Sequence, residues 1–230
     1  MKQTLLAVVA ILSASRWAQG EVRPNISLLN VGSFHKGEVN ALSGERWLGL
    51  VKNGSDSAWQ FFPVEIVTVQ DPLLDGDGQR SGSEVKVLEG EPMFLIRGAD
   101  ELASKKVKTV RFNPLGPMQV EQTPLQLSCQ DCKDALSLRL IDVTGPDGKV
   151  SRLILEGEGM SQTIYEWPEG FDDQHCELIW AGDLNGDGKI DLFMNLSDHY
   201  NVNKKTLLLS SKRKGSSLVE QVAVFKTTGS

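Results

Sequence analysis

Short apolar segments with a two-residue period recur along the whole chain, and they constrain its fold more than any other feature. Examples are "VEIVTV" at 64–69, "LSLRLIDV" at 136–143 and "IDLFMNL" at 190–196. Between such segments lie turns rich in Gly, Pro, Asn and Asp, such as "KNGS" and "TGPDG". The pattern predicts an all-β protein of many short antiparallel strands, built as a β-sandwich, as propeller-blade-like sheets, or as both. Only "ADELASKK" at 99–106 reads as a helix, and it is short.

Two segments suggest how the chain is divided. Lys2, the apolar run "LLAVVAIL" at 5–12 and the small residue Gly20 together predict a secretory signal peptide at 1–20, cleaved after Gly20. The stretch 111–124 holds three of the nine prolines, which disfavour pairing in a sheet. It predicts an N-terminal β region at 21–123 and a C-terminal β region at 124–230. A bent crossing within one sandwich is the alternative.

Charge and hydropathy indicate where the protein is located and which classes of partner it binds. Cleavage would remove Lys2 and Arg16 and no acidic residue, so the net charge would change from −6 to −8. This acidic balance argues against nucleic acid as a partner. No later segment is apolar and long enough to cross a bilayer, so stable membrane insertion is not expected. We expect an extracytoplasmic protein, periplasmic or secreted, whose partner is a protein or a carbohydrate.

The densest motif is "DLNGDGKID" at 183–191. It places side-chain oxygens at loop positions 1, 3, 5 and 9, and a backbone carbonyl at position 7. The side-chain oxygens belong to Asp183, Asn185, Asp187 and Asp191, and the carbonyl belongs to Lys189. Calcium takes about 6–8 oxygen ligands, which short side chains on a tight turn can deliver. The motif predicts a Ca²⁺ site; an acidic surface turn without metal is the alternative.

The loop differs from an EF-hand. Position 12, where an EF-hand has a bidentate Glu, is Met194. The residues that follow the loop alternate with a strand period, which predicts strand–loop–strand and not helix–loop–helix.

The stretch "IWAGDLNGDGKIDLFMNLS" resembles the FG-GAP/VCBS repeat, the calcium-loop unit of integrin-type β-propeller blades. The resemblance covers about residues 176–226. It implies that Asp183, Asn185, Asp187 and Asp191 bind calcium through their side chains and Lys189 through its carbonyl. It also implies that "KTLLLSS" and "LVEQVAVF" complete a four-stranded blade.

A degenerate copy of this unit is visible upstream. "IDVTGPDGKVSRLIL" begins at Ile141 and "GDLNGDGKIDLFMNL" at Gly182, and both contain Asp-Gly-Lys before an apolar strand. The first copy has Ser151 where the second has Asp191, so it keeps the turn and loses the ligands. Two unrelated Asp-Gly hairpins are the alternative.

The three cysteines indicate one local disulfide. Cys129 and Cys132 have the CxxC spacing, and a strand-like segment follows them, where a redox dithiol needs a helix. We therefore expect a disulfide that closes a turn outside the cytoplasm, with a redox dithiol as the alternative. Cys176 is then a free thiol.

Other candidates for chemistry are scattered. His35, His175 and His199 lack metal-ligand spacing and nucleophile motifs, although a triad from distant residues stays open. Asp75 and Asp77 suit either a second calcium turn or a plain hairpin turn.

These features predict a calcium-binding β protein that acts as a binding or scaffold module, with calcium in a structural role. The alternative is an extracytoplasmic hydrolase acting on polysaccharide or peptide, with the loop as an accessory element.

Overall fold

The computed structural model describes residues 26–54, 56–112, 116–129, 132–133, 135–146, 148–168, 174–210, 215 and 217–229. The predicted signal peptide at 1–20 lies outside this range. The all-β prediction is confirmed, because the described residues form fifteen strands and one short helix. The helix expected at 99–106 is the 3₁₀-helix η1, Asp100–Ser104, whose five residues amount to less than two turns.

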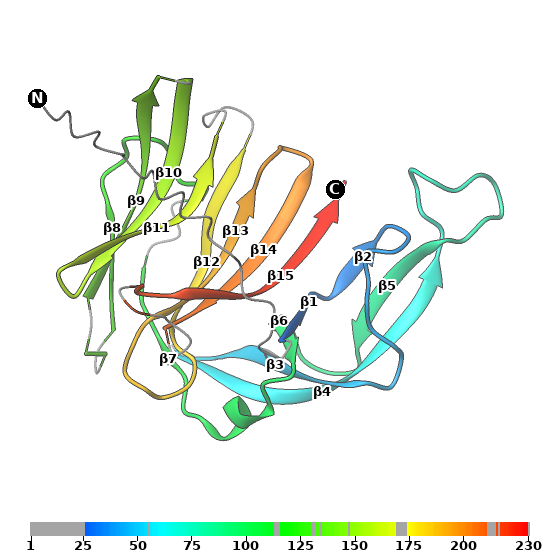
Figure 1. Ribbon diagram of the computed structural model, residues 1–230. Coiled ribbons are helices and arrows are strands. Elements are labelled where there is room, and N and C mark those ends of the chain that lie inside the picture. Colours follow the sequence, from blue (N-terminus) through cyan, green and yellow to red (C-terminus); the bar gives the residue numbers. More distant parts are fainter. Residues whose placement is uncertain are drawn as a thin grey trace, which may run out of the picture.

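The first sheet contains the first six strands, in the order β1-β6-β3-β4-β5-β2 (Figure 1). Their bounds are β1 Ser27–Leu29, β2 Gly32–Phe34, β3 Arg46–Asn53, β4 Asp56–Val69, β5 Gly82–Val87 and β6 Pro92–Arg97. The long strand β4 pairs with β3 through its first half and with β5 through its second half. One continuous strand therefore links the two parts of this sheet.

The central sheet is an antiparallel meander of β12 His175–Asp183, β13 Asp191–Ser197, β14 Val202–Leu209 and β15 Glu220–Thr228. The two-residue strand β7, Lys108–Thr109, extends it on the outer side of β12. A third sheet has the order β11-β10-β9-β8. Its strands are β8 Leu125–Ser128, β9 Ala135–Gly145, β10 Gly148–Gly157 and β11 Met160–Trp167.

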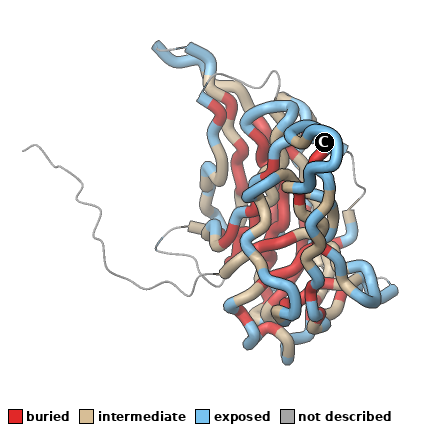
Figure 2. Tube along the Cα trace, turned by 90° about the vertical axis from the view of Figure 1, so that its right-hand side faces the viewer, coloured by how far each residue is buried: buried red, intermediate tan, exposed pale blue. Residues whose placement is uncertain are grey.

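The central sheet is buried on both faces. Phe193, Leu207 and Phe225 point into a core shared with the first sheet. Residues of the opposite phase, such as Leu192 and Met194, join a core shared with the third sheet. All seven residues of β13 are consequently buried, and Figure 2 shows the buried residues gathered along the middle of the molecule.

The predicted division between 123 and 124 stays a prediction, but the two regions share a core. The rings of Phe94, in the first sheet, and Phe193, in the central sheet, lie 4.4 Å apart. Strand β7 precedes the predicted division and still pairs with β12, which follows it. Within the described part of the chain, no helix is long and apolar enough to cross a membrane.

Candidate metal centre

The acidic loop connects β12 and β13, the first two strands of the central meander. The strand–loop–strand prediction is confirmed, because Asp183 ends β12 and Asp191 begins β13. Gly182 pairs with Asp191 across the two strands, so the carboxylates of Asp183 and Asp191 both lie at the base of the loop. Asp183 and Asp191 are each 0% exposed. The loop therefore carries two of its acids into the interior, where an uncompensated charge is costly.

Asp183 organises the loop backbone. Its Oδ1 accepts hydrogen bonds from the N–H groups of Asn185 at 3.3 Å, Gly186 at 2.7 Å and Asp187 at 3.2 Å, and its Oδ2 accepts one from Gly188 at 2.8 Å. Gly186 and Gly188 have φ of +76° and +84°, a left-handed conformation that glycine adopts without strain. One carboxylate thus holds four successive amides around itself.

The next two side chains fix the remaining turns. Asn185 Oδ1 accepts the N–H of Asp187 at 3.0 Å, and the Asn185 amide donates to Asp187 Oδ2 at 3.2 Å. Asp187 Oδ1 accepts the N–H of Lys189 at 2.8 Å. Short polar side chains that bond to the backbone two residues on are typical of tight turns.

Asp191 lies beneath the loop and joins it to the end of β14. Its Oδ2 accepts the N–H of Leu184 at 2.9 Å, and its Oδ1 accepts both the N–H and the hydroxyl of Ser210 at 2.8 Å. Burial raises the pKa of Asp191 to about 7; these hydrogen bonds lower it in part, and the charge of Asp187 raises it further. Ser210 is a contact that the sequence did not indicate, because it lies 19 residues further along the chain.

The loop acids have no cationic partner among the described residues. None of the ion pairs between described residues includes Asp183, Asp187 or Asp191. The ammonium of Lys189, within the loop itself, contacts Glu158 of the β10–β11 turn at 2.6 Å. No described cation pairs with these carboxylates, although the ammonium of Lys133 donates to the backbone carbonyl of Asp187 at 3.4 Å.

In the segment with the similar Asp-Gly-Lys turn, a lysine pairs with the partly buried acid. In the β9–β10 hairpin, Lys149 Nζ lies 2.7 Å from Asp142 Oδ2, and the Ser151 hydroxyl donates to Asp142 Oδ1. Burial opposes ionisation of Asp142, but these two partners outweigh it and lower its pKa. Lys189, at the corresponding place in the acidic loop, contacts Glu158 instead.

The donor chemistry of the loop fits a hard divalent cation. Three carboxylates, one amide oxygen and one backbone carbonyl lie within nine residues, and calcium prefers such oxygens. An ionised carboxylate has about four lone-pair sites. Asp187 and Asp191 accept two and three hydrogen bonds and keep acceptor capacity. Asp183 accepts four N–H groups, so calcium would have to displace part of them. The described residues contain no ready-made cluster of three or more carboxylate, imidazole or thiol side chains. Binding would therefore draw the carboxylates closer together than they lie here.

All three layers of the molecule meet at this loop. Trp59 of the first sheet donates its indole N–H to the carbonyl of Leu184 at 3.0 Å. From the third sheet, the N–H of Lys133 donates to the carbonyl of Gly188 at 2.8 Å, and Glu158 contacts Lys189. Order in the loop is therefore linked to the packing of both outer sheets on the central one.

The cysteines lie close to this junction. Cys129 and Cys132 are joined by a disulfide with a Cα–Cα distance of 5.1 Å, at the turn between β8 and β9. The element that follows is a strand, so the strand–CxxC–helix arrangement of redox dithiols is not present here. Cys176 is a free and buried cysteine, and burial raises the pKa of its thiol to about 12. A thiol with such a pKa is a poor nucleophile.

Each of the three histidines contacts a different side chain. His35 Nδ1 lies 2.8 Å from a carboxylate oxygen of Asp71, which resembles the base and orienting acid of a triad. No hydroxyl or thiol among the described residues bonds to the other nitrogen of His35. His175 contacts Glu177, and His199 contacts Asn201.

The acids near the β4–β5 connection accept hydrogen bonds from residues of that same connection. Asp71 also accepts the N–H groups of Leu73 and Leu74, and Asp75 accepts the N–H and hydroxyl of Ser81. Asp77 is exposed. These contacts favour the plain-turn interpretation of Asp75 and Asp77 over a second calcium site.

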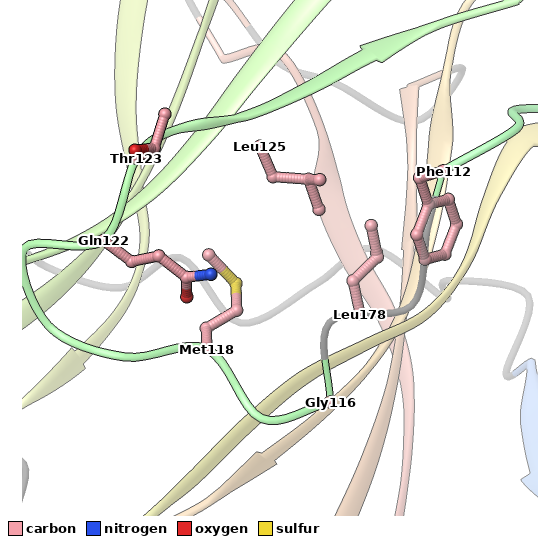
Figure 3. A pocket seen from close by; sticks show the side chains of 7 residues that line it. All are labelled: Phe112, Gly116, Met118, Gln122, Thr123, Leu125 and Leu178. Atoms are coloured by element: carbon pink, nitrogen blue, oxygen red, sulfur yellow. The ribbon is translucent and has the colours of Figure 1, made fainter.

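A small cavity lies between the proline-rich segment and β12 (Figure 3). Its volume is about 20 Å³, which leaves room for about one water molecule. The lining residues are Phe112, Gly116, Met118, Gln122, Thr123, Leu125 and Leu178, none of which carries a carboxylate, imidazole or thiol. This cavity is too small to hold a substrate.

Comparison of the chain with protein-family models, with curated proteins and with solved structures finds no match. The residues and their geometry therefore carry the functional argument.

Proposed function

We propose that the protein is a secreted or periplasmic β protein that binds calcium at residues 183–191 and acts as a binding or scaffold module. One observation carries the proposal. Asp183 and Asp191 are fully buried carboxylates without a cationic partner among the described residues, at the point where the three sheets meet. A divalent cation would supply the missing positive charge.

The ligands would be the side chains of Asp183, Asn185, Asp187 and Asp191 and the carbonyl of Lys189. Calcium would neutralise the acids and link the base of the loop to its tip. The antiparallel meander β12–β15 is compatible with the four-stranded blade of FG-GAP/VCBS repeats, which supports this assignment. The predicted signal peptide supports a location where calcium reaches the millimolar range that extracellular modules need.

Calcium has a structural role in this proposal. A catalytic ion needs a coordination position that substrate can reach, whereas Asp183 and Asp191 are 0% exposed. The module would bind a protein or a carbohydrate through surfaces that the folded junction holds in place. The hydrolase alternative has no comparable support, since the described histidines contact three different side chains and no hydroxyl or thiol of the described part of the chain bonds to His35.

Thermal unfolding in calcium, magnesium and chelator tests the proposal. A ligand that binds only the folded state at 100 times its Kd adds about 2.7 kcal/mol of stability. For a chain of this size, that corresponds to a rise in Tm of about 5–10 °C. We expect this rise in saturating calcium and a much smaller one in magnesium, which keeps its water ligands.

Asp187→Ala should abolish the calcium-dependent rise, because it removes a central ligand and leaves both strands intact. Asp142→Ala is the matched control: it removes the corresponding turn acid, which Lys149 already neutralises, and should leave the rise unchanged. Wild-type melting curves that superimpose in calcium and in chelator would refute the proposed site. Loss of the rise in Asp142→Ala would place the ion elsewhere.

A further inference from the structure

The disulfide turn is in direct contact with the candidate calcium loop through Lys133. The N–H of Lys133 donates to the carbonyl of Gly188 at 2.8 Å, and its ammonium donates to the carbonyl of Asp187 at 3.4 Å. The lysine stem lies along the loop backbone, because a Cβ built on Gly188 would be only 3.2–3.3 Å from its carbons. Lys133 therefore contacts the loop between two of its candidate ligands.

The disulfide fixes the position of Lys133. Cys132 is the preceding residue, and it is tied to Cys129 by the covalent bond and by a 3.2 Å hydrogen bond from its N–H to the carbonyl of Cys129. Both cysteines are partly buried against the core shared by the third and central sheets. Without the covalent bond, the turn would have more conformations available, and Lys133 would lose part of its restraint.

We propose that the Cys129–Cys132 disulfide is a redox-sensitive control of calcium affinity, an inference that rests on the proposed calcium site. A dithiol reductant would transfer two electrons and two protons to the S–S bond. The bond breaks, Cys129 and Cys132 become thiols, and the reductant becomes a disulfide. Both cysteines are only partly buried.

Reduction weakens calcium binding because the freed turn no longer restrains the loop backbone at Gly188, so binding has to order more of the loop. The link is one backbone hydrogen bond and one packed stem, so we expect about a fivefold increase in Kd, at the low end of couplings between two sites. Coupling between two equilibria is reciprocal. Bound calcium should therefore make the disulfide about fivefold harder to reduce.

Calorimetric titration of the full chain with calcium, oxidised and after reduction with dithiothreitol, measures the first effect. The double variant Cys129→Ser, Cys132→Ser should match the reduced protein and should not respond to the reductant. Lys226→Ala, at an exposed position on β15, should leave calcium binding unchanged in both redox states.

The reciprocal effect needs no variant. The wild-type protein is equilibrated with mixtures of reduced and oxidised dithiothreitol, in saturating calcium or in chelator, and its thiols are then counted. The ratio at which half of the disulfide is reduced should shift by about fivefold. An equal Kd for oxidised and reduced protein, together with superimposed reduction curves, would overturn the coupling and leave the calcium site standing. Absence of calcium binding in both redox states would overturn the site and the coupling together.

Discussion

Asp183→Ala is expected to lower the free energy of unfolding by about 3 kcal/mol even when calcium is absent. The carboxylate accepts four backbone N–H groups, two of them at 2.7 and 2.8 Å, and it is fully buried. A buried donor left without a partner costs about 1–3 kcal/mol, and of the four donors only that of Gly188 belongs to a buried residue. Urea unfolding in chelator measures this loss, and calcium should no longer restore stability.

Two variants separate the structural from the metal-binding role of this residue. Asp183→Asn keeps one carbonyl oxygen as an acceptor and loses the charge, so it should lose about half as much stability as Asp183→Ala and still lose calcium binding. Asp187→Ala should be the mildest of the three in chelator, because Asp187 accepts only the Asn185 amide and the Lys189 N–H. Wild-type stability of Asp183→Ala in chelator would contradict the role of Asp183 in the loop.

Phe193→Ala is expected to cost about 3–5 kcal/mol, the range for loss of a buried phenylalanine. Its ring is 1% exposed and lies 4.4 Å from that of Phe94, so it joins the central sheet to the first sheet. Because β13 belongs to both cores, the variant should unfold in a single transition whose midpoint lies at a lower urea concentration than that of the wild type. Tryptophan fluorescence and far-UV circular dichroism over a urea series measure both properties.

Val224→Ala is the control for this substitution. Val224 lies on β15 of the same sheet but is 37% exposed, and its replacement should change stability by about 0.5 kcal/mol or less. Two separate transitions in Phe193→Ala, with only one of them moved, would show that the two cores unfold independently. That result would contradict the shared role of β13.

The strands and the loop could be predicted from the sequence because their signals are local. Alternation marks β10 and β13, and the spacing from Asp183 to Asp191 marks the turn between two strands. The burial of β13 on both faces could not be predicted in this way. Asn195 and Ser197 are polar positions in this alternation, yet both are buried. Asn195 accepts the N–H of Lys204 at 2.8 Å and bonds to Asn203 at 3.1 Å. Side-chain alternation cannot show that a polar face will be satisfied internally.

The contacts around the loop could not be predicted from the sequence either. Ser210 is 19 residues from Asp191, Lys133 is 54 residues from Asp187, and Trp59 is 125 residues from Leu184. The sequence indicated which residues carry the oxygens, but only the fold shows which acid each lysine pairs with. Lys149 turns to Asp142 in one hairpin, while Lys189 turns to Glu158 in the other.

Calorimetric titration of the oxidised wild-type protein with calcium tests the central claim most directly. We expect one calcium ion per chain, with a Kd of roughly 10⁻⁴–10⁻³ M as in extracellular modules, and no detectable binding to Asp187→Ala. Titration without binding heat at millimolar calcium, repeated at a second temperature to exclude a vanishing enthalpy, would contradict the account, as would unchanged binding by Asp187→Ala.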